Sequence, residues 1–171
     1  MSTKEQLKIL FLSRRYPPSV GGIQTHCFNL FNRLQSNHTI KLIALGNQSL
    51  LHLAWFVPYT FLASFIHILF NRVDVVYFSD GVICCLAPFL RPFTRARFVV
   101  TVYGLEMTYA TPIFSSLMRW GVSVCEKVPV ISEKTREVSI AAEVPPDKID
   151  IIYLGIDPPT VSDERREELK K

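Results

Sequence analysis

The sequence predicts an α/β fold in which a Rossmann-like open parallel sheet is flanked by helices. Three observations indicate it. Six short β-rich runs alternate with longer runs of helical pattern. The β-rich runs are almost continuously apolar, as in strands that are buried on both faces of a parallel sheet. The chain has 171 residues, of which 49% are apolar and 20% charged, so one domain can bury a sizeable core. We therefore expect right-handed crossovers between neighbouring strands.

The elements follow from local patterns. The expected strands are 7–13, 38–45, 73–79, 96–103, 127–132 and 148–154. The expected helices are 22–36, 50–71, 81–90, 112–127 and 132–142. The first helix has an apolar stripe at i, i+4, i+7, i+8 and i+11, formed by Ile23, Cys27, Leu30, Phe31 and Leu34. Helix starts are indicated by Thr111 with Pro112, and by Ser132, because these residue types favour N-cap and N1 positions.

Composition and spacing argue against several functions. The net charge is only +4 and the basic residues are scattered, without a nucleic-acid-reading motif, so we expect no nucleic-acid partner. The four cysteines contain no CxxC pair, which favours free buried thiols in a reducing compartment. The histidines show no HExxH spacing, so no metal site is expected. The first apolar run, ILFL, is too short for a signal peptide, and we expect a cytoplasmic location.

The segment 51–70 is 20 residues long and has no formal charge, so it is long enough to cross a bilayer. We expect Pro58 to interrupt it. A span would also place the strands at 40–45 and 73–78 on opposite sides of the membrane, and one sheet could not then contain both. The alternatives are a helix that packs on the sheet and a helix that lies partly in a membrane interface.

A surface helix in this segment would carry many apolar side chains. Its aromatic residues include Trp55, Phe56, Phe61 and Phe65. An exposed patch of this kind usually marks a partner or a membrane surface. Peripheral attachment to the inner face of a membrane therefore stays open beside simple packing.

The loop that follows the first strand predicts a ligand site. The strand ends at Ser13, a stiff Tyr16-Pro17-Pro18 segment follows, and Gly21-Gly22 leads into a helix. Ligands of open α/β sheets bind at the carboxyl ends of strands, where glycines allow close approach and a helix N-terminus suits phosphate. The loop matches neither GxGxxG nor GxxxxGK[ST], which disfavours a dinucleotide oxidoreductase. A tight turn without a ligand is the alternative.

Five segments, in order, resemble glycosyltransferase family 4. The first, YPPSVGGIQTHCFNLFNRL, is similar to that family's Pro-Pro-x-x-Gly-Gly-x-Glu/Gln loop and first helix. The others resemble its Asp-Val-Val strand, its His-Gly-x-Glu/Asp strand end, its Ser-Glu strand and helix, and its Val-Ile-Pro-Asn-Gly-Val-Asp exit segment. These are VDVVYFSDG (73–81), RFVVTVYGLEMTY (97–109), VPVISEKTREV (128–138) and DKIDIIYLGIDP (147–158).

The resemblance implies one half of a GT-B fold. Residues 1–158 would form the N-terminal, acceptor-side domain, and 159–171 a linker or the start of a missing C-terminal donor-binding domain. It implies a retaining transfer of a hexose-type sugar from a nucleotide-sugar donor to a hydroxyl of a glycan or lipid-linked acceptor, without a metal or other cofactor. The family's Glu-x7-Glu pair belongs to the second domain, so we expect this chain alone to be inactive unless a separate chain supplies that half.

The resemblance also implies the site residues. Gly21 and Gly22 would line the donor diphosphate, and Tyr103 occupies the catalytic position at which the family has histidine. The expected acceptor and cleft residues are Gln24, His26, Gly104, Glu106 and Ser132. His26 could instead be a packed helix residue, Glu106 a turn carboxylate and Ser132 a helix cap.

Two segments depart from the family's pattern, and the first of them, together with the missing second half, favours a rival function. Tyrosine has a reference pKa near 10, so Tyr103 cannot change charge at neutral pH as a histidine can. Tyr153-Leu154 stands where the family has Pro-Asn, which alters the expected hinge. The rival is a non-catalytic Rossmann-like module that binds a partner or a membrane through 51–70.

Overall fold

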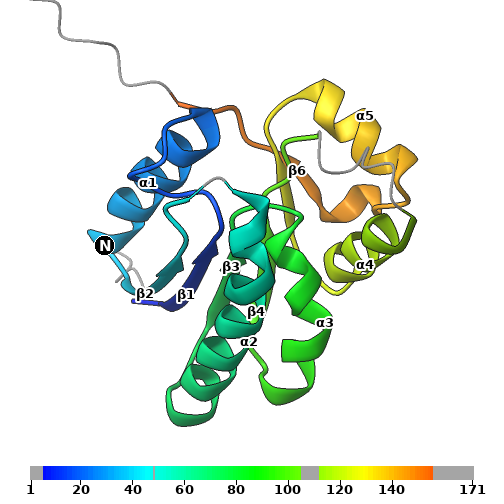
Figure 1. The fold of residues 1–171 in the computed structure, drawn as a ribbon. Helices are drawn as coiled ribbons and strands as arrows, with labels where there is room; N and C mark the ends of the chain where they lie inside the picture. Colours follow the sequence, from blue (N-terminus) through cyan, green and yellow to red (C-terminus); the bar gives the residue numbers. More distant parts are fainter. Residues whose placement is uncertain (1–5, 48, 105–111, 156–171) are drawn as a thin grey trace, which may run out of the picture.

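The computed structural model of the protein describes residues 6–47, 49–104 and 112–155, and it has the predicted α/β architecture (Figure 1). The predicted linker, 159–171, lies outside the described residues. The strands are β1 (Lys8–Ser13), β2 (Thr39–Ala44), β3 (Val75–Phe78), β4 (Arg97–Val100), β5 (Val128–Val130) and β6 (Ile149–Ile151). The helices are α1 (Gly22–Gln35), α2 (Leu53–Phe70), α3 (Ala87–Leu90), α4 (Pro112–Ser123) and α5 (Glu133–Ala141).

The strands run parallel, and their order places a ligand site. Four of them form a sheet in the order β2-β1-β3-β4, and β5 pairs with β6. Parallel bridges Val99–Lys127 and Val102–Val130 join β5 to β4. The chain moves outward to β2 on one side of β1 and to β3 on the other. The topological switch point therefore lies between the carboxyl ends of β1 and β3, where open α/β sheets bind ligands.

Both faces of the sheet are covered, which explains the continuously apolar strands. Ile9 and Phe11 of β1 face α1, whose predicted apolar stripe packs there around the buried Cys27. Leu10 and Leu12 face the opposite side, where they share a core with α2, α3 and α4 (Figure 1). Because side chains alternate along a strand, burial of both faces requires apolar residues at successive positions.

Helix α2 packs on the sheet and is continuous through Pro58, so the predicted interruption is wrong. The carbonyl that Pro58 cannot engage belongs to Ala54, an exposed residue, which lessens the cost of the lost bond. The helix is long and apolar enough to cross a membrane by length and composition alone. However, β2 and β3, which precede and follow α2, lie in one sheet. The structure thus shows a packed helix rather than a span.

The expected helix at 81–90 is a 3-10 turn at Ile83–Leu86 followed by α3, and a second 3-10 turn, Arg91–Phe93, continues beyond its predicted end. Pro88 and Pro92 lie in the first turn of α3 and of this second 3-10 turn, respectively. Proline lacks the N–H group that a continuing helix needs, so each proline starts a new turn. The predicted strand 96–103 also ends early, at Val100, and only the Val102 bridge continues its pairing.

Gly121 of α4 allows this helix to approach the 3-10 turn at Ile83–Leu86. A Cβ at Gly121 would lie 2.3 Å from the Cys84 carbonyl oxygen, which is backbone and cannot rotate away. We expect Gly121→Ala to lower the free energy of unfolding by about 3 kcal/mol, since overpacking a core forces the backbone apart. Urea unfolding measures this loss. Ser123→Ala, at an exposed position of the same helix, is the control and should change stability little. Equal stability of the two variants would contradict the close contact.

Candidate functional site

The carboxyl ends of the strands come together at one edge of the sheet. Backbone hydrogen bonds join them: Ser79 N–H donates to Leu12 O, Thr101 N–H to Phe78 O, and Val102 N–H to Pro129 O, at 2.9, 3.1 and 2.9 Å. The loops that leave β1, β3, β4 and β5 therefore start side by side. This edge contains the described members of the predicted site.

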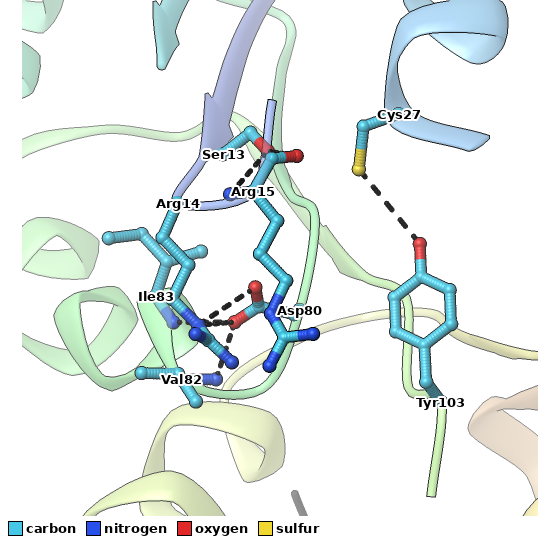
Figure 2. Close-up of polar contacts among 8 residues, drawn as sticks. All are labelled: Ser13, Arg14, Arg15, Cys27, Asp80, Val82, Ile83 and Tyr103. Carbon is cyan, nitrogen blue, oxygen red and sulfur yellow. Dashed lines mark hydrogen bonds and ion pairs between the residues drawn. The ribbon is translucent and has the colours of Figure 1, made fainter. Parts of the chain in front are cut away.

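A buried ion pair lies at the switch point between β1 and β3 (Figure 2). Arg14 directly follows β1, and Asp80 lies two residues after the end of β3. The Arg14 Nε atom is 3.1 Å from both carboxylate oxygens of Asp80. Asp80 Oδ1 also accepts the N–H groups of Val82 and Ile83, at 2.8 and 3.1 Å. The Arg14 and Asp80 side chains are only 9% and 2% exposed. Asp80 thus holds both the arginine and the turn after β3.

The Arg14–Asp80 pair was not predicted from the sequence. The sequence feature that could have indicated it is the position of the two residues. A charged side chain just after a fully apolar strand must lie at the carboxyl edge of the sheet. Asp80 engages Arg14 through Nε, and no described residue forms a hydrogen bond or ion pair with the two terminal nitrogens of the guanidinium group. Arg14 therefore has donors left for an anion at this edge.

Gly21 and Gly22 form the start of α1, as predicted. Gly21 is the N-cap, no described side chain caps this end, and the first turn has no acidic residue. The N–H groups of the first turn precede the first intrahelical bond, from Thr25 N–H to Gly21 O, and point out of the helix end. A Cβ at Gly22 would meet no atom within 4 Å. An anion can consequently approach the backbone closely here.

Gln24 is buried directly behind the glycines. It is 3% exposed, and a Cβ at Gly21 would lie 2.5 Å from its Oε1 atom. The first glycine is thus needed because the amide of Gln24 packs against it. Each glycine of the pair has a separate reason: Gly21 makes room for Gln24, and Gly22 leaves the helix end bare.

The proline segment is fixed against the end of β2. Tyr16 N–H donates to Leu45 O at 3.1 Å, and a Cβ at Gly46 would lie 2.6 Å from Pro18. The Pro17–Pro18 peptide is cis. The Tyr16 ring packs edge-on against Phe28 of α1. The loop before α1 is therefore held by contacts with two neighbouring elements.

Tyr103 lies beside α1, and its hydroxyl group is directed toward the helix. The Tyr103 Oη atom is 4.0 Å from the Cys27 Sγ atom (Figure 2), and the His26 ring packs edge-on against Tyr103 at 5.9 Å. Burial raises the pKa of Tyr103 above its usual value, and Cys27 adds to this shift. Burial lowers the pKa of His26, so its imidazole is uncharged at pH 7. Both side chains are neutral. His26 is a packed helix residue, as one predicted alternative had it, and its role in the cleft stays a prediction.

Gly104 and Ser132 both lie next to Thr135, in the first turn of α5. Gly104 has a positive φ of 104°, which favours glycine, and its ideal Cβ position lies 3.5 Å from Thr135 Oγ1. Ser132 is the N-cap of α5, and its Oγ atom accepts the Thr135 N–H at 3.1 Å. The helix-cap interpretation of Ser132 is therefore confirmed. Glu106 lies outside the described residues.

The arrangement suits an anionic ligand better than acid–base chemistry. The edge offers the bare N-terminus of α1 and the terminal nitrogens of Arg14. The described residues include no cluster of three or more His, Cys, Asp or Glu side chains that could hold a metal ion. The four cysteines are free and buried, as the sequence predicted.

The family profile described as Glycosyltransferase Family 4 matches residues 20–159. A search of curated proteins gave no match.

Solved structures with a similar fold include HepE from Anabaena in complex with UDP-glucose (15% identity, TM-score 0.62) and with UDP (15%, 0.65). In each case the similar region covers 96% of this chain and 50% of the HepE chain. The lipopolysaccharide outer core galactosyltransferase WaaB in its apo form is also similar, at 14% identity and a TM-score of 0.62. The similar region covers 91% of this chain and 48% of the WaaB chain. At these identities the likeness shows the fold. The chain spans about half the length of these structures.

Proposed function

Because the chain belongs to glycosyltransferase family 4, we propose that it is the acceptor-side half of a retaining enzyme that uses a nucleotide-sugar. The transferred group is a hexose-type sugar, and the acceptor is a hydroxyl of a glycan or a lipid-linked compound. A second, donor-binding half completes the cleft, and this chain alone is inactive. The enzyme requires no metal and acts in the cytoplasm.

The main support for this proposal is the difference between the N-termini of α1 and α5. Both helices start at the carboxyl edge of the sheet, but α5 is capped by Ser132 and has Glu133 in its first turn. The start of α1 has neither feature among the described residues. A bare helix N-terminus carries a partial positive charge and free N–H donors, which suit a diphosphate. The family match and the UDP-glucose bound to HepE support a donor of this class.

The residues of this site would have different chemical roles. The N–H groups at Gly22 would donate to the leaving diphosphate, and Arg14 would supply the positive charge, since His26 is neutral. Stabilising charge on a leaving group is a large part of transferase catalysis. Tyr103 would line the site as a neutral hydrogen-bonding side chain and would not transfer protons, because its raised pKa keeps the phenol protonated.

The acceptor side follows from the position of α2. This helix begins a few residues after Gly46, which packs against the Pro17–Pro18 segment. An acceptor that reaches the glycine loop from this side would pass the apolar start of α2. This supports a lipid-linked acceptor over a free sugar.

Titration of the labelled chain with UDP-glucose, UDP and NAD tests the proposal by NMR. We expect UDP-glucose and UDP to shift the backbone amides of Gly22, Ile23 and Gln24 and the Arg14 Nε–H signal, with weak affinity, in the range of about 1 mM, because only half of the cleft is present. The capped start of α5 is the internal control.

The absence of shifts at α1 up to about 10 mM would overturn the donor site. Tight binding of NAD would instead favour the oxidoreductase that the sequence disfavours.

A further inference from the structure

Helix α2 has an unusual distribution of apolar residues. We call its exposed apolar side the α2 outer face; its members are 47–84% exposed and are Leu51, in the turn before the helix, and Trp55, Tyr59, Leu62, Ile66, Leu69 and Phe70. From Leu51 to Leu69 they recur every three or four residues, so they form one stripe along the helix, which ends at Phe70. No charged side chain interrupts the stripe, since segment 51–70 contains none.

The side of α2 that faces the protein includes two hydroxyl residues among its apolar ones. Its buried residues are Phe56, Thr60, Ser64 and Ile68. The hydroxyl groups of Thr60 and Ser64 are buried without a hydrogen-bond partner in the described structure. A surface helix of a soluble protein normally has the reverse arrangement, with polar groups toward water. The α2 outer face is therefore adapted to an apolar environment rather than to water.

Positive charge borders one side of the stripe. A hollow of about 500 Å³ lies between α2 and the edge strand β2, where Lys41 and His67 meet the apolar side chains of Ile66 and Phe70. A second hollow of about 280 Å³ continues from it and adds Lys8 and Arg72.

Asp74 neutralises only part of this border. Asp74 accepts the Arg72 Nε–H at 3.1 Å and the Lys8 N–H at 2.9 Å. The side chains of Lys8 and Lys41 form no hydrogen bond or ion pair with described residues, so the border keeps a net positive charge.

Aromatic side chains lie at the other end of the stripe. Trp55 and Tyr59 are about half exposed, and their rings are 6.1 Å apart. Such side chains have an apolar ring and a polar tip, and they favour the level of the lipid headgroups.

We propose that the α2 outer face lies in the interface of an anionic lipid bilayer, with Lys41 and Lys8 bound to lipid phosphates at its border. The helix lies parallel to the membrane and does not cross it, because β2 and β3 share one sheet. Burial of the apolar stripe and attraction of the cations to anionic headgroups both contribute to binding. This inference does not depend on the donor site at α1.

A second copy of the chain fits this surface less well. In a two-fold dimer the same patch meets itself, so each cationic border would need acidic groups from that patch. Among the residues that the structure describes, the acidic group at the border is Asp74, which already binds Arg72. An anionic membrane supplies the missing negative charge.

Vesicle flotation tests the proposal. At low salt we expect the chain to float with vesicles of phosphatidylcholine and phosphatidylglycerol and to bind pure phosphatidylcholine less well. The variant Leu62→Gln/Ile66→Gln/Leu69→Gln should lose binding, and Lys41→Gln should weaken it about fivefold. The control is Ile140→Gln/Ile152→Gln, which changes exposed apolar residues on other elements and should bind normally.

A second measurement reports directly on α2. The chain has two tryptophans, so Trp120→Phe leaves Trp55 as the sole indole. Its emission should shift to shorter wavelength with anionic vesicles. No flotation, or no shift, would overturn the proposal, as would unchanged binding of a folded triple variant. A dimer in vesicle-free solution that the triple variant dissociates would assign the face to a second copy. The UDP titration should be the same for the triple variant, so failure of one proposal is distinguishable from failure of the other.

Discussion

Gly22→Val is expected to reduce sugar transfer by about 100-fold or more in the proposed two-domain enzyme, because a displaced donor no longer aligns with the acceptor. A Cβ at this position meets no atom within 4 Å, so valine has room in the folded chain. Its methyl groups would occupy the space in front of the first N–H groups of α1, where the diphosphate is proposed to bind. The substitution therefore separates a ligand role from a folding role.

Initial rates with saturating acceptor measure the loss, and thermal unfolding checks the fold. Asn32→Val is the matched control, since it places the same β-branched residue at an exposed position near the other end of α1. Its rate should equal that of the unmodified enzyme. If Gly22→Val transfers sugar at a normal rate, the diphosphate does not bind at this helix end. If the variant unfolds, the space in front of Gly22 is not open.

Asp80→Ala is expected to lower the free energy of unfolding by about 3–5 kcal/mol, because it leaves the buried Arg14 guanidinium without its counter-charge. The substitution also removes the acceptor of the Val82 and Ile83 N–H groups. Urea unfolding followed by circular dichroism measures the change. The effect is large because the Arg14 and Asp80 side chains are 9% and 2% exposed, so most of the guanidinium stays shielded from water when its partner is removed.

Asp150→Ala is the control for an exposed ion pair. Asp150 lies 2.9 Å from Lys127, and both side chains are 51% exposed. Solvent screens such a pair, and we expect a loss below about 1 kcal/mol. Equal losses for the two variants would mean that the switch-point pair contributes no more than a surface contact. A second comparison, Arg14→Met/Asp80→Leu, should recover part of the loss, since a buried ion pair can be replaced by apolar groups of similar size.

The fold could be predicted from the sequence because its signals are local. The strands are read from continuous apolar runs, and α1 from the spacing of Ile23, Cys27 and Leu30. The Gly21-Gly22 pair directly after a proline segment indicated a close backbone approach. Each of these features depends on residues within one or two turns of each other, which a single sequence contains in full.

The wrong predictions concern segments in which tertiary contacts outweigh the local preference of the sequence. Pro58 was expected to interrupt a helix, but α2 continues through it, packed against the core. The segment 81–90 was expected to be one α-helix, but it is a 3-10 turn followed by α3, whose first turn contains Pro88. Propensity is a weak prior in such places, because packing and capping contribute more than the intrinsic preference of a residue.

The sequence by itself determined the order of strands and helices, the position of the glycine loop before α1 and the resemblance to glycosyltransferase family 4. Only the tertiary structure decided which side of α2 is exposed, that Tyr103 is directed toward Cys27, and that Arg14 and Asp80 form a pair. Arg14 and Asp80 are 66 residues apart in the chain. The reason is physical: apolar period and turn chemistry are properties of neighbouring residues, whereas burial and charge pairing depend on which distant segments the sheet brings together.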